Sequence, residues 1–266
     1  MLKVTSIIEP MKIGINRPFL VVCNDQKQYV MKCKTEITND KILFNELIGN
    51  RVSYLLNLPA PKCHCARLSI ELINSSPDLR SLGAKPGTVF VSQFTPGSPA
   101  MMKPVFDSAV NYNDFGGIIF FDQLLMNTDR GSNGGNWFYD RKEKKVILID
   151  NSNIFRMAAV WDQYTLISDE RIPPVILNEL DGRGYQLLKS IMNKKSSYPF
   201  DKIKRRAKQI THPDINKLFS NIPSDWDISK EDKTAANHFI TFQFDHTDDI
   251  ISQLETKFKD TNKGGK

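Results

Sequence analysis

The sequence predicts an α+β fold with two lobes that share one cleft, and three observations lead to it. Short β-type segments separated by turn residues fill the first third of the 266 residues, whereas the pattern from about residue 173 onward is helical. Turn-forming residues at 95–99 suit a connector between lobes. The chain length is also close to the limit of roughly 250 to 300 residues for a single hydrophobic core.

The N-terminal lobe, residues 1–95, is predicted to be an antiparallel sheet with one helix. Its first three strands form a meander, with Asn24, Asp25 and Gln26 as turn residues before the third strand. Asn39 and Asp40 then provide N-cap chemistry for a helix whose apolar positions recur from 42 to 56 and which ends before prolines. The five strands are expected at 4–8, 19–23, 29–34, 63–72 and 88–93.

The C-terminal lobe, residues 96–258, is predicted to be larger and mainly helical. A buried helix begins at Phe115 and runs to Met126, and a polar loop with three glycines follows at 127–136. Two short strands, 137–139 and 146–149, flank a charged turn. Residues 259–266 are polar and are predicted to be a flexible tail.

The composition is that of a globular protein, with 40% hydrophobic and 25% charged residues, which excludes general disorder. Thirty-six Lys and Arg against 30 Asp and Glu leave a net charge of +6, which favours phosphate-bearing ligands only weakly. A basic cluster could touch nucleic acid, but such a run on a late helix is more often a solvated face, so direct nucleic-acid binding is not expected. The cluster consists of Lys202, Lys204, Arg205, Arg206 and Lys208.

The sequence predicts a cytoplasmic protein that does not enter a membrane. Its apolar stretches are shorter than the roughly 20 residues that span a bilayer, and residues 1–12 lack the apolar region of a signal peptide. Four scattered cysteines are too few for a disulfide scaffold in a chain of this length. We therefore expect free thiols in a reducing compartment.

Three acidic or amide residues in the middle of the chain suggest a shared catalytic site. Asp129 lies in the polar loop, Asn136 ends that loop, and Asp150 follows the second short strand. This order is how kinases place a base beside the acceptor hydroxyl and two oxygen ligands around magnesium. Each residue alone is most simply a turn or cap residue, but two upstream residues strengthen the kinase interpretation.

These upstream residues are Lys32 on the third predicted strand and Glu46 in the following helix. Phosphoryl transfer needs a cation on the nucleotide phosphates and an anion that holds this cation in place. Lys32 resembles the strand lysine of the Val-Ala-Ile-Lys pattern, and Glu46 could form the matching ion pair. The order of all five residues therefore favours a kinase.

Several segments resemble the HipA-like kinases, in particular shorter HipA-related bacterial domains within the protein-kinase-like superfamily. Residues 55–61, Leu-Leu-Asn-Leu-Pro-Ala-Pro, are similar to the Gly-Leu-Pro-Val-Pro turn that ends the family's helix. Residues 121–130 resemble a helix that runs into an Asn-Thr-Asp-Arg-His catalytic loop. Residues 149–155, Ile-Asp-Asn-Ser-Asn-Ile-Phe, are similar to the Ile-Asp-His-Gly-His-Ala-Phe metal segment. The resemblance covers roughly residues 5–156.

The resemblance implies a two-lobed protein-kinase-like fold that uses ATP and Mg²⁺. Asp129 would be the catalytic base, Asn136 and Asp150 would hold magnesium, and Lys32, oriented by Glu46, would bind phosphates. The adenine would contact the hinge, mostly through backbone groups, and a turn would cover the phosphates. These last two expectations fall on Gln93, Phe94 and Thr95 for the hinge and on the turn around Gly14.

The catalytic loop departs from the family pattern at two places. Gly131 stands where the family has His, and the asparagines lie four (Asn133) and seven (Asn136) positions after Asp129 instead of five. We prefer Asn136 as the metal ligand because Gly-Asn-Trp resembles the Gly-Asn-Leu that begins the family's next strand. This choice implies a two-residue insertion, absorbed by the glycines at 134 and 135.

The main functional interpretation is an ATP-dependent kinase with a protein serine or threonine as the acceptor, by analogy alone. A nucleotide-binding pseudokinase or interaction module is an alternative, since the altered loop could bind nucleotide without transferring phosphate. A kinase of a small molecule or a lipid shares the same residues. Larger HipA relatives are toxins restrained by a small DNA-binding antitoxin, which implies an antitoxin or regulatory protein partner here.

Overall fold

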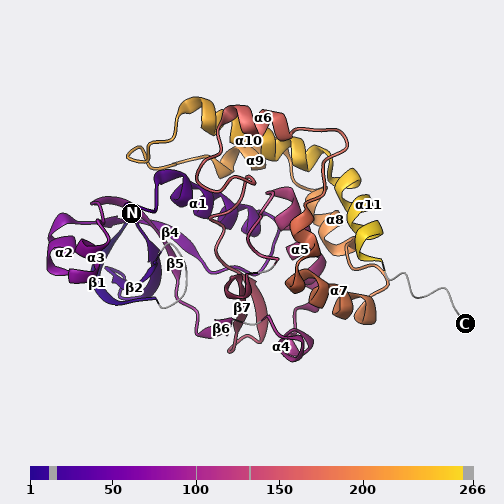
Figure 1. Ribbon diagram of the computed structural model, residues 1–266, viewed down its shortest axis with the longest axis horizontal. Coiled ribbons are helices and arrows are strands. Elements are labelled where there is room, and N and C mark those ends of the chain that lie inside the picture. The colour runs from indigo at the N-terminus through magenta and orange to yellow at the C-terminus, as the bar shows by residue number, and fades with distance from the viewer. Residues whose placement is uncertain (12–16, 100, 132, 260–266) are drawn as a thin grey trace, which may run out of the picture.

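A computed structural model describes residues 1–11, 17–99, 101–131 and 133–259 (Figure 1). One lobe is built on a five-stranded sheet and the other is mainly helical, and Figure 1 shows them side by side with helix α1, Asp40–Leu55, between them. The predicted α+β arrangement is confirmed. The lobe limits at 95 and 258 remain predictions.

The strands of the first lobe form a closed barrel in the order β1-β2-β3-β5-β4. Neighbouring strands pair antiparallel except β1 and β4, which pair in parallel through Leu2 with Ala66 and Lys3 with Arg67. The prediction of an antiparallel sheet is therefore wrong for the pair that closes the barrel, because β1 and β4 run in the same direction. The bounds are β1 Leu2–Pro10, β2 Phe19–Cys23, β3 Gln28–Lys32, β4 Cys63–Leu68 and β5 Gly87–Gln93.

The prediction of one helix in this lobe is also wrong. Beside α1 the lobe contains α2, Ile70–Ser75, and α3, Pro77–Ser81, where the sequence analysis expected a strand end and a loop. Ser69 and Ser76 accept hydrogen bonds from the backbone N–H groups of Leu72 and Leu79 and so begin these helices. The predicted strand 63–72 includes Ser69, and Ser76 lies between two predicted strands, so the prediction contains neither cap.

Helix α1 begins where the sequence predicts, with Asn39 as its N-cap. The side chain of Asn39 accepts a hydrogen bond from the N–H of Ile42 at 3.2 Å. Almost every side chain from 42 to 53 is buried, including the polar Asn45 and Glu46. A helix that is buried on all sides packs against both lobes and has no wholly polar face. Its buried polar residues therefore need specific partners.

The second lobe is organised around α5, Phe115–Leu124, whose ten residues are all buried. A three-stranded sheet packs near it in the order β6-β7-β8, of which the hairpin of β7 and β8 was predicted. The connector predicted at 95–99 is partly strand β6, Gly97–Pro99, and the C-terminal run of helices predicted from about residue 173 begins earlier, at α6, Gln163–Asp169. The remaining bounds are β6 Gly97–Pro99, α4 Lys103–Ser108, η1 Tyr112–Asp114, η2 Gly134–Asn136, β7 Trp137–Asp140, β8 Lys145–Leu148, α6 Gln163–Asp169, η3 Asn178–Asp181, α7 Arg183–Lys195, α8 Asp201–Ala207, α9 His212–Leu218, α10 Lys230–Asp245 and α11 Thr247–Phe258.

Residues 225–226 of the helical lobe, far in sequence from the connector, also form hydrogen bonds with the barrel. The carboxylate of Asp225 accepts hydrogen bonds from the N–H of Thr88 at 2.8 Å and from Arg67 at 3.2 Å. The buried indole of Trp226 donates to the carbonyl oxygen of Thr88 at 2.9 Å. The two lobes are thus joined at a second place by hydrogen bonds.

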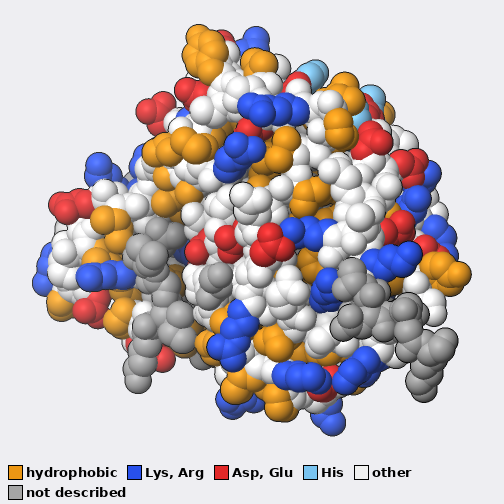
Figure 2. All heavy atoms as spheres, turned by 45° about the vertical axis from the view of Figure 1, so that its right-hand side comes forward, with side chains coloured by type: hydrophobic (Ala, Val, Ile, Leu, Met, Phe, Trp, Pro, Cys, Tyr) orange, Lys and Arg blue, Asp and Glu red, His pale blue; other side chains and the backbone are white. Residues whose placement is uncertain are grey.

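Three of the five residues in the basic cluster on α8 and just after it form ion pairs with acidic neighbours. Lys202 pairs with Asp114 at 2.5 Å, and Lys204 and Lys208 pair with Asp248 at 3.2 and 2.7 Å. Figure 2 shows charged side chains of both signs interspersed over one face of the molecule. Within the described part of the chain, no helix has the length and apolar character needed to cross a membrane.

Candidate active site

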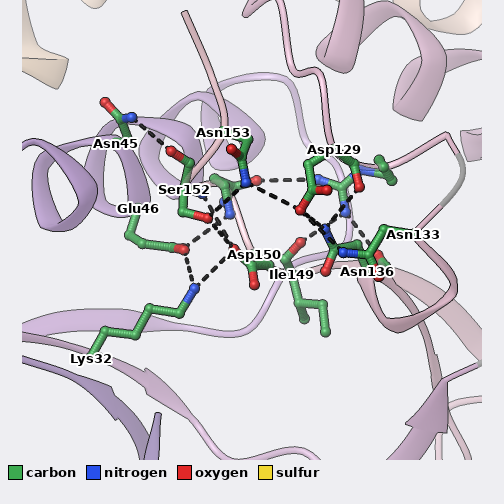
Figure 3. A network of polar contacts seen from close by, with 12 residues as sticks. Lys32, Asn45, Glu46, Asp129, Asn133, Asn136, Ile149, Asp150, Ser152 and Asn153 are labelled. Atoms are coloured by element: carbon green, nitrogen blue, oxygen red, sulfur yellow. Dashed lines mark hydrogen bonds and ion pairs between the residues drawn. The ribbon is translucent and has the colours of Figure 1, made fainter. Parts of the chain in front are cut away.

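A buried ion cluster joins the two lobes at the cleft (Figure 3). Lys32, at the end of β3, donates a hydrogen bond to Glu46 of α1 at 2.5 Å and to Asp150 at 2.9 Å. The predicted pair of Lys32 and Glu46 is therefore present. Asp150 lies two residues after β8 with a φ of 53°, a left-handed conformation that Asp adopts more readily than most residues.

The charges of this cluster are set by burial and by the mutual attraction of its members. Burial would lower the pKa of Lys32, yet the two carboxylates raise it above its ordinary value. Burial would raise the pKa of Asp150, but Lys32 and the hydroxyl of Ser152 hold it well below its ordinary value. Burial raises the pKa of Glu46 to about 7 against the attraction of Lys32. Lys32 is therefore cationic and Asp150 anionic at neutral pH.

Asp129 faces this cluster and is held by three amide groups (Figure 3). Its Oδ2 atom accepts hydrogen bonds from the side-chain nitrogens of Asn136 at 2.9 Å, Asn133 at 3.1 Å and Asn153 at 3.1 Å. Asn136 also donates to the carbonyl oxygen of Asp129 at 3.1 Å. Both asparagines weighed in the sequence analysis thus contact Asp129, and a third, Asn153, was not foreseen. Three donors on one oxygen fix the orientation of the carboxylate.

A second buried network holds the loop that bears Asp129. Arg130 donates from Nε to both carboxylate oxygens of Asp122 on α5, at 3.0 and 2.9 Å. It also donates from one terminal nitrogen to the carbonyl oxygens of Asn136 at 2.9 Å and Ile149 at 2.8 Å. Because Ile149 precedes Asp150, Arg130 connects the loop that bears Asp129 to the segment that carries Asp150.

This network was not predicted, although the sequence contains a signal for it. Asp122 is a charged residue within a helix whose other residues are almost all apolar. A carboxylate that cannot avoid burial needs a partner, and Arg130 is eight residues downstream.

The cluster and Asp129 line a cavity of about 760 Å³ between the lobes. Its size lies within the range of pockets that hold small-molecule ligands. Val30, Phe90, Phe138 and Ile147 provide apolar walls, which suit a flat ring system. The cavity is also lined by eight of the predicted site residues, Lys32, Glu46, Gln93, Phe94, Thr95, Asp129, Asn136 and Asp150. The ninth, Gly14, lies outside the described residues.

The hinge segment 93–95 offers fewer backbone groups than the sequence analysis expected. The N–H of Gln93 donates to the carbonyl oxygen of Lys62 at 2.7 Å, and the N–H of Phe94 donates to that of Gln28 at 3.0 Å. Both groups are therefore used in the barrel. Of the three, Thr95 is the residue whose N–H makes no backbone bond within the part of the chain that the structure describes.

The cavity wall fits a hard divalent cation. Asp150 offers an ionised carboxylate, and Asn136 offers an amide oxygen once its nitrogen is bonded to Asp129. Oxygen ligands are those that Mg²⁺ prefers. Among the described residues that line the cavity there is no cysteine or histidine, the ligands that zinc prefers. These residues could thus hold a magnesium ion together with nucleotide phosphates.

Comparisons with known proteins identify a family and a fold. A family model described as HipA-like kinase matches residues 4–165, more than half of the chain. No match to this sequence is found among curated proteins. Several solved structures share the fold at low sequence identity.

Three of these structures cover nearly the whole chain. The proinflammatory kinase CtkA of Helicobacter pylori has 15% identity and a TM-score of 0.60, over 95% of this chain and 98% of that chain. A Golgi casein kinase with Mn and ADP bound has 11% identity and a TM-score of 0.52, over 97% and 75%. HipA of Shewanella oneidensis, in a complex with HipB and operator DNA, has 11% identity and a TM-score of 0.42, over 92% and 65%. At these identities the likeness shows the fold alone.

Proposed function

Since the chain belongs to the HipA-like kinase family, we propose that it transfers the γ-phosphate of ATP to a serine or threonine of a protein. The observation that carries the proposal is that Asp129 and the cluster of Lys32, Glu46 and Asp150 line the same cavity. Phosphoryl transfer depends mainly on positioning and on charge stabilisation, and these residues provide both.

Lys32 binds the phosphates of the nucleotide in this proposal. An ammonium group has three N–H donors, and Glu46 and Asp150 accept two of them. A further donor is left for a phosphate oxygen, while Glu46 holds the nitrogen at the cavity wall. The apolar walls take the adenine ring, and the N–H of Thr95 is the hinge donor that we assign to it.

Asp150 and Asn136 would hold Mg²⁺, and the bound ion would neutralise negative charge on the phosphates. Asp129 orients the acceptor hydroxyl and accepts its proton. The three amide donors on Oδ2 fix this carboxylate, so that its direction does not need to be set during the reaction. Asn133 keeps Asp129 in place in this scheme, while Asn136 contacts both Asp129 and the metal.

The proposal is tested by incubating the protein with γ-labelled ATP, Mg²⁺ and cell lysate, and by following label in protein. Asp129→Asn and Asp150→Asn should each lower the transfer rate by about 100-fold or more, because they remove the base and the charged metal ligand. Asp107→Asn is the matched control, since Asp107 forms an exposed ion pair on α4. Label transfer at the unmodified rate in both site variants would refute the assignment.

Calorimetry with ADP and Mg²⁺ separates a kinase from a pseudokinase. Nucleotide binding without label in any acceptor, free hydroxyl compounds included, would favour the pseudokinase interpretation. The regulatory protein partner stays a proposal that rests on the family resemblance, and it is tested by purifying the protein together with the product of the neighbouring reading frame.

A further inference from the structure

A continuous chain of hydrogen bonds joins Asp129 to Asp150 through Ser152 and Asn153, which lie two and three positions after Asp150 (Figure 3). The side-chain nitrogen of Asn153 donates to Asp129 Oδ2 at 3.1 Å and to the hydroxyl of Ser152 at 3.2 Å. The hydroxyl of Ser152 donates to Asp150 Oδ1 at 2.7 Å. Lys32 contacts the same oxygen of Asp150 at 2.9 Å. We call Ser152 and Asn153 the bridging pair.

The number of hydrogens fixes the direction of each bond. The amide nitrogen of Asn153 has two hydrogens, one for Asp129 and one for Ser152. The hydroxyl of Ser152 has one hydrogen, which goes to Asp150, so its oxygen is the acceptor toward Asn153. Both ends of the chain are therefore carboxylate oxygens that accept a hydrogen bond. Ser152 and Lys32 both donate to Oδ1 of Asp150, so Oδ2 is the oxygen that would bind a metal ion.

The backbone of the bridging pair is held from both sides. The buried Asn45 of α1 donates to the carbonyl oxygen of Ser152 at 2.8 Å, and the N–H of Thr128 donates to that of Asn153 at 3.2 Å. The side chain of Ser152 is also almost fully buried, with 3% of the residue exposed. The pair is therefore a rigid connection between helix α1 and the loop that bears Asp129.

We propose that Ser152 and Asn153 are positioning residues that set the separation of Asp129 from Asp150, and hence of the acceptor hydroxyl from the metal-bound phosphates. The inference rests on the proposed function and adds to it two residues with a defined role. Ser152 stands where the similar metal segment has Gly, which has no hydroxyl to donate. The hydrogen bonds between Asp129 and Asp150 therefore depend on a hydroxyl that the similar segment lacks.

Replacing Ser152 tests the proposal through its effect on the metal requirement. Partners that orient a metal ligand typically contribute about 10- to 100-fold to metal affinity or activity. We expect Ser152→Ala to need about 10-fold more Mg²⁺ for half-maximal enhancement of ADP binding, measured by calorimetry. Ser152→Cys keeps the size but has only a weak donor, so it should behave in the same way, whereas Ser152→Thr should restore much of the metal affinity.

Two comparisons separate a linking role from a merely structural one. Asn133→Ala removes a donor to the same oxygen of Asp129 but does not touch Asp150, so it should lower turnover while the Mg²⁺ requirement stays the same. If the bridging pair acts as a unit, the double variant Ser152→Ala with Asn153→Ala should be about as impaired as the worse single variant. Ser168→Ala on the surface of α6 controls for loss of a hydroxyl elsewhere.

The results decide whether the bridging pair links the two carboxylates or only supports the local structure. A Mg²⁺ requirement in Ser152→Ala and Ser152→Cys that equals that of Ser168→Ala would overturn the proposal, and so would additive effects in the double variant. Thermal melting of each variant identifies those that fail to fold, and Ser152→Cys then replaces Ser152→Ala. Magnesium-dependent ADP binding is measured whether or not phosphate is transferred. Binding without any transfer in the unmodified protein would therefore refute the proposed function alone.

Discussion

Arg130→Met is predicted to destabilise the protein by about 3–5 kcal/mol, because it leaves a buried carboxylate without its cation. Asp122 has no exposed surface, and Arg130 is only 1% exposed. In the variant Asp122 keeps two neutral donors, the hydroxyl of Tyr185 at 2.9 Å and the amide of Asn127 at 2.8 Å. These bonds reduce the loss but do not balance the charge.

The lost contacts to backbone carbonyls add to this effect. Arg130 donates to the carbonyl oxygens of Asn136 and Ile149, and an unsatisfied buried acceptor costs about 1–3 kcal/mol. The expected total stays within the range for a broken buried pair, because methionine fills part of the space that Arg130 leaves. At about 2–4 °C per kcal/mol for a chain of this size, the melting temperature should fall by about 6–20 °C.

The pH dependence of the loss identifies its cause. Burial raises the pKa of Asp122 even though Arg130 opposes this effect, so the pKa should rise further in the variant. A carboxyl group whose pKa is higher in the folded than in the unfolded state destabilises the protein as the pH rises from the unfolded pKa through the folded pKa. The deficit of Arg130→Met should therefore be smaller at about pH 5 than at about pH 8.

Thermal melting at both pH values, followed by circular dichroism, measures these effects. Arg205→Met is the matched control because Arg205 is exposed on α8, and its melting temperature should stay close to that of the unmodified protein. The reasoning would be refuted by an Arg130→Met variant that melts within about 2 °C of the unmodified protein at about pH 8.

Three further changes test the packing. Gly49→Ala should destabilise the protein by about 1–3 kcal/mol although alanine favours helices, because its Cβ would lie 2.5 Å from that of Asn151; a melting temperature at or above the original would contradict this close approach. Asp225→Ala should accelerate amide hydrogen exchange at Thr88 by removing the acceptor of its N–H, and unchanged exchange would argue against the second junction of the lobes. Burial raises the pKa of Cys33 to about 12, so this thiol stays protonated at about pH 8 and should react with iodoacetamide only after unfolding. Rapid labelling of Cys33 in the native protein would show that the group is open to solvent.

Local features of the fold could be predicted from the sequence because they depend on neighbouring residues. The strands β2 and β5, the hairpin of β7 and β8, and the N-cap of α1 at Asn39 follow from turn residues, alternation and capping chemistry within a few positions. The prediction of a strand over residues 63–72 was wrong at its end because Ser69 provides a cap that local β-propensity does not reveal.

The barrel could not be predicted in the same way. The parallel pairing of β1 with β4 joins segments about sixty residues apart, and its closure depends on the twist and curvature of all five strands. The use of the hinge N–H groups within the barrel is a consequence of that closure. A sequence pattern contains no information about which backbone groups remain for a ligand.

The sequence by itself determined which residues we propose for the chemistry, because phosphoryl transfer needs particular side chains in a particular order, and Lys32, Glu46, Asp129 and Asp150 occur in that order. Only the tertiary structure decided how they contact one another. The bond from Lys32 to Asp150 spans 118 residues. Asn153 contacts Asp129 because the segment after Asp150 lies between α1 and the loop that bears Asp129. Such contacts depend on how buried surfaces of both lobes fit together, and burial of polar groups is tolerated only where that fit supplies their partners.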